Sequence, residues 1–129
     1  MDKIVLNTEL YSSKNSRKFV RNRRTGQTFI VKSARAQQQE RVLDVLLNQN
    51  KEIWYEMVKE KKYPLRVGFY IYRKTRMRWD WVNIIQGLAD AMVKAGYIED
   101  DSAFYFTPYF IGWDIDKNNP RVEISVLWF

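Results

Sequence analysis

The chain has 129 residues, of which 46% are hydrophobic, enough for one domain with its own core and too few for two. We therefore expect a single domain over residues 1–129. The 22 Lys and Arg residues against 15 Asp and Glu give a formal charge of +7, so the expected partner is a polyanion, either nucleic acid or an acidic membrane surface. Cysteine and histidine are absent, which excludes disulfides, zinc sites with thiolate or imidazole ligands, and Ser-His-Asp catalysis.

No apolar run approaches the length of a membrane span, and the hydrophobic stretch that follows Met1 is too short for a signal peptide. We expect a cytoplasmic protein with no membrane partner. Any bound metal must be held by oxygen, because the chain offers no thiolate or imidazole. Oxygen ligation suits Mg²⁺, with Mn²⁺ as a substitute.

Apolar and β-branched residues predict a first strand over residues 4–10, followed by a polar loop over 11–17. The next two apolar segments, 18–21 and 28–31, predict a hairpin. Its connection carries Gly26, which can adopt the positive φ that a tight turn needs.

Ser33 is a good N-cap for a long helix over residues 34–59, in which apolar residues recur at helical spacing. The polar run 48–50 weakens the middle of this helix, so a break or kink there stays an open alternative. Alternating apolar and polar residues then predict a strand with one buried face over 65–72.

A second helix is predicted over residues 80–95, with Gly96 at the C′ position beyond its end. Aromatic and β-branched residues predict two final strands, over 104–113 and 122–128. This order of elements indicates an α+β fold, in which a mixed sheet carries two main helices largely on one face.

Acidic and amide side chains stand before, along and after the second predicted helix of this basic chain. The series comprises Asp80, Asn83, Gln86, Asp90, Asp100 and Asp101. Carboxylates gathered where a basic surface would collect phosphates suggest a metal-dependent enzyme that acts on nucleic acid. The alternative structural explanations are an N-cap at Asp80, a solvated polar face along the helix, and an exposed loop after it.

The order and spacing of this series resemble the RusA family of Holliday-junction endonucleases, found in bacteria and their phages. The family's core pattern is Asp-x-Asp-Asn at the start of a helix, a Lys one turn on, Asp-Ala-Leu late in the helix, Ala-Gly, and an Asp-Asp pair. The corresponding residues here are Asp80-Trp81-Val82-Asn83, Gln86, Asp90-Ala91-Met92, Ala95-Gly96 and Asp100-Asp101-Ser102. More loosely, residues 11–15 and the basic residues after them resemble the family's N-terminal loop.

The resemblance implies a homodimer that binds four-way DNA junctions and cuts opposed strands with Mg²⁺ or Mn²⁺. In the family, both Asp residues of the first motif and the second Asp of the pair hold the metal, while the Lys assists the chemistry. Here Val82 replaces the second of these acids, and Gln86 replaces the Lys. The implied metal ligands are therefore Asp80 and Asp101, and the candidate catalytic residues are Asp80, Asn83, Gln86, Asp90, Asp100 and Asp101.

Two clusters of basic and amide side chains are candidates for contacts to the DNA backbone. They comprise Lys14, Asn15, Arg17, Lys18, Arg21, Arg23, Arg24 and Lys32, and then Arg73, Lys74, Arg76 and Arg78. Such contacts give an affinity that is independent of base sequence and falls with salt, whereas the alternative is a solvated charge run. Most of the abundant aromatic residues are expected in the core or at a dimer interface, and one or two could stack on bases unpaired at a junction centre.

The expected function is a metal-dependent, structure-selective endonuclease that resolves Holliday junctions in recombination, repair or phage DNA processing. Two alternatives stay open. One is a branched-DNA-binding protein of the same fold that no longer cuts, because Val82 and Gln86 remove too much of the site. The other is a general basic nucleic-acid-binding module with an incidental acidic helix.

Overall fold

The computed structural model describes residues 2–11 and 17–129, with the backbone alone for residues 17–19 and 29–32. Within this part, the strands are β1 (Ile4–Leu6), β2 (Arg17–Arg21), β3 (Thr28–Lys32), β4 (Leu65–Arg73), β5 (Phe106–Ile115) and β6 (Arg121–Val126). The helices are α1 (Ala34–Gln49), α2 (Lys51–Val58) and α3 (Trp81–Lys94). The predicted α+β class is confirmed.

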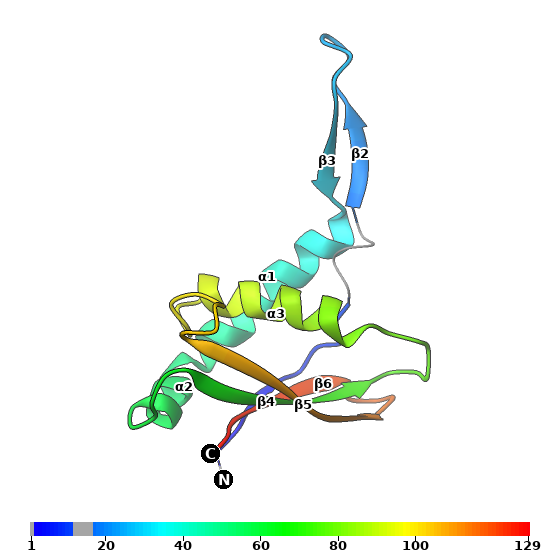
Figure 1. The fold of residues 1–129 in the computed structure, drawn as a ribbon. Helices are drawn as coiled ribbons and strands as arrows, with labels where there is room; N and C mark the ends of the chain where they lie inside the picture. The colour runs from blue at the N-terminus through cyan, green and yellow to red at the C-terminus, as the bar shows by residue number, and fades with distance from the viewer. Residues whose placement is uncertain (1, 12–16) are drawn as a thin grey trace.

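Four strands form the main sheet in the order β1-β6-β4-β5. The β4 and β5 strands are parallel while the other pairs are antiparallel, so the sheet is mixed as predicted. The α1 and α3 helices lie over one face of this sheet, and the β2–β3 hairpin projects away from them (Figure 1). None of the helices in the described part of the chain is long and apolar enough to cross a membrane.

Several predicted boundaries differ from the structure, including the end of the last strand, which stops at Val126 and not at residue 128. The predicted 34–59 helix is interrupted at Asn50, whose side chain donates to the carbonyl of Leu46 at 2.8 Å, so the open alternative of a break is the correct one. The first strand stops at Leu6, because the chain turns at Thr8. The β5 strand begins and ends two residues later than predicted, because its parallel pairing with β4 continues to Arg73.

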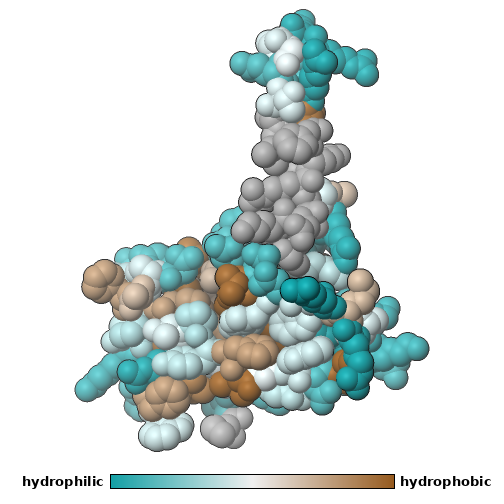
Figure 2. Space-filling view, turned by 45° about the vertical axis from the view of Figure 1, so that its right-hand side comes forward, coloured by the Kyte–Doolittle hydropathy of each residue, from teal (hydrophilic) through white to brown (hydrophobic). Residues whose placement is uncertain are grey.

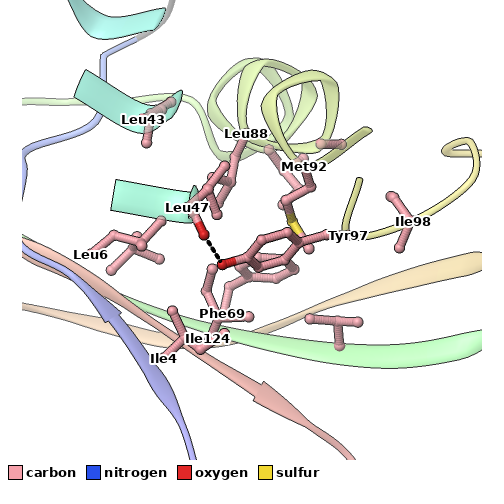
Figure 3. Close-up of a cluster of buried hydrophobic side chains, with 14 of the residues drawn as sticks. Ile4, Leu6, Leu43, Leu47, Phe69, Leu88, Met92, Tyr97, Ile98 and Ile124 are labelled. Atoms are coloured by element: carbon pink, nitrogen blue, oxygen red, sulfur yellow. Dashed lines mark hydrogen bonds between the residues drawn. The ribbon is translucent and has the colours of Figure 1, made fainter. Parts of the chain in front are cut away.

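The core lies between the sheet and the helices, and it includes Ile4, Leu6, Phe69 and Ile124 from the strands and Leu43, Leu47, Leu88 and Met92 from the helices (Figure 3). Tyr97 crosses this layer, and its hydroxyl donates to the carbonyl of Leu47 at 2.5 Å. Burial raises the pKa of Tyr97 to about 12, so the phenol keeps its proton further into the alkaline range than a free tyrosine does. The ring of Trp54 stacks on Tyr97, with centroids 5.0 Å apart, and together they anchor the segment that follows α3.

The α3 helix forms as its sequence predicts. Its apolar stripe is buried, with the members Ile85, Leu88, Ala89 and Met92. Gly96 has φ of 80° at the C′ position, and the Tyr97 N–H donates to the carbonyl of Met92 at 2.9 Å while the Gly96 N–H donates to that of Val93 at 3.0 Å. These paired bonds form a Schellman motif, which ends the helix and turns the chain toward the paired acids.

Gly96→Ala is expected to lower the free energy of unfolding by about 1 kcal/mol, because an L side chain is strained at positive φ. The new Cβ would also lie 3.0 Å from the ammonium nitrogen of Lys51. Urea unfolding measures the change, with Gly96→Asn as a matched variant that tolerates this φ better. Equal stability of the Ala variant and the wild type would contradict the role of Gly96 as the helix stop.

Candidate functional site

Asp80 is the N-cap of α3, seven residues after Arg73 at the end of β4. One oxygen of its carboxylate accepts the N–H groups of Val82 at 3.0 Å and Asn83 at 3.4 Å. The other oxygen accepts the side-chain amide of Asn83 at 3.1 Å. Asp80 is therefore an N-cap, as one of the alternative structural explanations predicted. Because the carboxylate is also exposed and each oxygen has more than one lone pair, capping leaves it able to bind an external group.

A hollow of about 620 Å³ surrounds this carboxylate, and we call it the Asp80 hollow. It is lined by Tyr11, Arg35, Arg73, Met77, Arg78, Trp79, Asp80, Trp81, Asn83 and Ile84. The hollow lies where the parallel β4 and β5 strands end, the usual position of ligand sites in α/β units. Three arginines and one carboxylate give the Asp80 hollow a net positive charge, which suits a phosphate group.

Two of these arginines are held in place by aromatic rings. The guanidinium carbon of Arg35 lies 3.6 Å from the ring centroid of Tyr11, and that of Arg73 lies 5.4 Å from Trp79. Arg73 also donates a hydrogen bond to the carbonyl of Leu10. These contacts limit the motion of both side chains, so their charges stay beside the hollow.

The other candidate acids lie in a second hollow, of about 450 Å³, between α1 and α3. Its lining includes Asp90, Asp100 and Asp101, together with Asp44, Glu40 and Lys94. Hydrogen bonds from the side chain and the backbone N–H of Ser102 lower the pKa of Asp100. Asp90 and Asp101 are exposed, and among the described residues neither carboxylate has a hydrogen-bond or ion-pair partner, so both are available to an external ligand.

One chain does not bring Asp80 and Asp101 together. Asp80 lines the Asp80 hollow at the start of α3, whereas Asp101 lines the second hollow together with Gly87 and Asp90. Asp90 lies ten residues beyond Asp80, or about 15 Å along the axis. Among the described residues, no three acidic side chains lie close enough together to hold a metal ion. The single chain therefore separates the sequence-predicted site into two halves.

The sequence matches the family model described as endodeoxyribonuclease RusA over residues 11–127, which is nearly the whole chain. The chain belongs to the RusA family. This family acts on Holliday junctions, binds branched DNA and generally depends on a divalent metal. Among curated proteins, none matches the chain.

The two departures from the RusA pattern are both at the surface of α3. Val82 is 61% exposed, and Gln86 is exposed one turn later. Their side chains are not needed in the core, so these substitutions alter the chemistry of the RusA site more than the packing of the fold. Arg35 and Arg73 supply positive charge in the Asp80 hollow, although Gln86 itself does not line that hollow. Within the described part of one chain, no second acid occupies the Asp80 hollow in place of the lost aspartate.

Arg35 is a site residue that sequence reasoning missed. It lies in the first turn of α1, about 45 residues from Asp80, and no motif or spacing connects the two. Tyr11, which supports Arg35, was assigned only to a loop that resembles the RusA N-terminal loop. The fold alone brings both residues to the Asp80 hollow.

The basic clusters fall into two places. Arg21, Arg23 and Arg24 are exposed toward the end of the β2–β3 hairpin, and the tip of this hairpin is mostly hydrophilic (Figure 2). Lys14 and Asn15 lie outside the described residues, as do the side chains of Arg17, Lys18 and Lys32. In the second cluster, Arg73 and Arg78 line the Asp80 hollow, and Lys74 and Arg76 are exposed between them in the chain.

Proposed function

We propose that the protein is a metal-dependent, structure-selective endonuclease that resolves four-way DNA junctions during recombination, repair or phage DNA processing. The proposal has Mg²⁺ as the cofactor, Mn²⁺ as a substitute, and a homodimer as the active form. One observation carries it. An oriented carboxylate stands at a helix N-terminus inside a hollow lined by three arginines, in a chain of the RusA family.

The two halves of the predicted site are supplied by two chains in this proposal. Asp80 and Asn83 of one protomer would act with Asp101 of the partner subunit, because Asp80 and Asp101 line different hollows within one chain. A metal ligand must lie about 2.1 Å from Mg²⁺, so a second copy is the simplest source of the missing acid. Asp90 and Asp100 line the same hollow as Asp101, so the partner subunit would bring all three acids to the site.

The residues of the chain have separate tasks in strand cleavage. Asp80 and the partner subunit's Asp101 would hold the divalent cation, which when bound polarises the scissile phosphate and activates water. Asn83 keeps the Asp80 carboxylate in one orientation. The three arginines of the Asp80 hollow would bind the phosphates on either side of the cut and stabilise the charge that develops there. Gln86 would contribute a hydrogen bond, since it can neither carry charge nor supply a proton.

Removing two charges from the hairpin tip tests its part in DNA binding. The double change Arg23→Ala and Arg24→Ala should weaken binding to junction and duplex alike, and lower the slope of log affinity against log salt by about 2. Titration of labelled DNA at several salt concentrations measures this slope. Lys59→Ala is the control, because that exposed lysine is paired with Glu56 on α2. An unchanged slope in the double variant would remove the hairpin tip from the DNA interface.

Cleavage is tested directly with a labelled four-way junction and a linear duplex of matching sequence, in Mg²⁺, in Mn²⁺ and in chelator. Paired nicks in the junction alone, dependent on metal, are the expected result. Junction binding without nicks under any metal would instead favour a branched-DNA-binding protein of the same fold that no longer cuts, because Val82 and Gln86 replace an acid and a lysine of the site. Equal affinity for junction, linear duplex and single-stranded RNA would favour the general nucleic-acid-binding module.

A further inference from the structure

A third hollow adjoins the Asp80 hollow. Its volume is about 320 Å³, and it is lined by Arg76, Met77, Arg78, Trp79, Trp81, Phe110 and Trp113. We call it the aromatic hollow. Four of its lining residues, 77–79 and Trp81, also line the Asp80 hollow. A group bound in the aromatic hollow would therefore lie beside a group bound at Asp80.

Trp79 contacts two rings of this hollow edge-on, while Trp81 and Phe110 lie tilted at 48° with centroids 5.0 Å apart. The ring centroid of Trp79 lies 5.5 Å from that of Trp113, with the planes at 72°, and 6.1 Å from that of Phe110, with the planes at 63°. Edge-on contacts of this kind do not cover ring faces as parallel stacking does. Trp113 remains 40% exposed and Phe110 remains 45% exposed, so aromatic surface is open to a ligand.

A β-bulge brings the two strand residues of the hollow to one face of the sheet. Phe69 of β4 pairs with Phe110, but the next residue, Tyr70, pairs with Gly112, so Ile111 is an extra residue in β5. In a regular strand, side chains three positions apart point to opposite faces. The bulge reverses this relation for Phe110 and Trp113, and both rings contact Trp79. Bulges often redirect a side chain beside a functional site.

The rim of the hollow is positively charged. Arg76 and Arg78 are exposed, and in the described part of the chain neither forms an ion pair. A second copy of the same surface would bring arginines against arginines, which opposes self-association there. A nucleic acid offers both groups that this surface can bind, an aromatic base for the rings and a phosphate for the guanidinium groups.

We propose that the aromatic hollow binds a nucleobase that is unstacked at the crossover of a branched DNA, while Arg76 and Arg78 hold the adjoining phosphates. This inference rests on the proposed function, because it places the base beside the phosphate to be cut at Asp80. The bases of a linear duplex are all stacked, whereas those at a branch can leave the stack. The hollow therefore selects for branched structure, and it does so for any base because every base has a π-face.

The test uses a four-way junction with 2-aminopurine at the crossover, in chelator so that no strand is cut. The 2-aminopurine fluorescence should change when the wild type binds, and Trp113→Ala should lose this change. The same variant should bind the junction about 10-fold more weakly, with unchanged affinity for linear duplex. Trp113→Phe should keep most of both signals. Trp128→Ala is the matched control, because Trp128 is 86% exposed and lines no part of the hollow.

A junction with an abasic site at the crossover completes a double-mutant cycle, in which loss of the base is combined with loss of the Trp113 ring. Removing the base should weaken wild-type binding to the level of Trp113→Ala and have no further effect on that variant. If a folded Trp113→Ala protein instead binds both junctions as the wild type does, the base site is wrong even when the wild type cuts junctions. A wild type that shows the fluorescence change but cuts nothing would support the base site and overturn the proposed cleavage.

Light scattering tests whether Trp113→Ala dissociates the dimer. If it does, and the wild type shows no fluorescence change, the hollow is an interface between copies and the proposed base site is wrong. A wild type that binds junction and duplex equally and gives no fluorescence change would overturn both proposals.

Discussion

Asp101→Asn is expected to lower metal-dependent cleavage of a four-way junction by at least roughly 100-fold, as for loss of a metal-binding group. Junction binding in chelator should be retained or tighter, because removing a negative charge near phosphates relieves repulsion. The change should not disturb the fold, since the side chain is exposed and bonds to no other described residue. Rates of nicking and gel-shift titrations measure the two effects.

Asp114→Asn is the matched control for this variant. Asp114 is an exposed carboxylate near the end of β5, and it lines neither the Asp80 hollow nor the hollow between α1 and α3. Its substitution should leave the cleavage rate unchanged. Markedly weaker DNA binding by a well-folded Asp101→Asn protein would count against the placement of Asp101 near the cut.

A mixture of Asp80→Asn and Asp101→Asn proteins tests whether two chains share each site. Asparagine is as good an N-cap as aspartate, so Asp80→Asn should keep α3 intact. Each variant alone should be inactive. If the site joins Asp80 of one protomer with Asp101 of the partner subunit, a mixed dimer has one complete site and regains nicking of one strand. If each site lay within one chain, every site in the mixture would carry a lesion and no activity would return.

Trp54→Ala is expected to lower the free energy of unfolding by about 3–5 kcal/mol, the range for removing a large aromatic side chain from a core. Trp54 has no exposed surface. It stacks on Tyr97 and donates its indole N–H to the carbonyl of Tyr97 at 2.8 Å. The variant therefore leaves a cavity and an unpaired carbonyl at the segment that leads to Asp101. Urea unfolding followed by circular dichroism measures the loss.

Two further substitutions make this stability test specific. Trp54→Phe keeps most of the ring volume and loses the indole N–H, so it should fall between the wild type and the Ala variant. Trp128→Ala removes the same side chain from an exposed position and should change stability by less than about 0.5 kcal/mol. A Trp54→Ala protein as stable as the Trp128→Ala protein would contradict the central place of Trp54 in the core.

The parts of the site that the sequence predicted are those set by near neighbours in the chain. The spacing of Ile85, Leu88 and Met92 identifies the buried face of α3, and Asp80 and Gly96 mark its ends, because helical period and caps depend on residues within two turns. The same local series supports the family assignment. The strand boundaries were less accurate, since the ends of β5 depend on pairing with β4 and not on its own residues.

The amino-acid sequence by itself determined the class of the fold, the limits of α3, the basic charge and the membership of the RusA family. Only the tertiary structure decided that Arg35 lies beside Asp80, that Asp80 and Asp101 occupy different hollows, and that a bulge turns Trp113 toward Trp79. The physical reason is distance along the chain. Caps and helical stripes arise from contacts between residues a few positions apart, whereas these three features arise from packing between elements that meet only when the sheet and helices assemble.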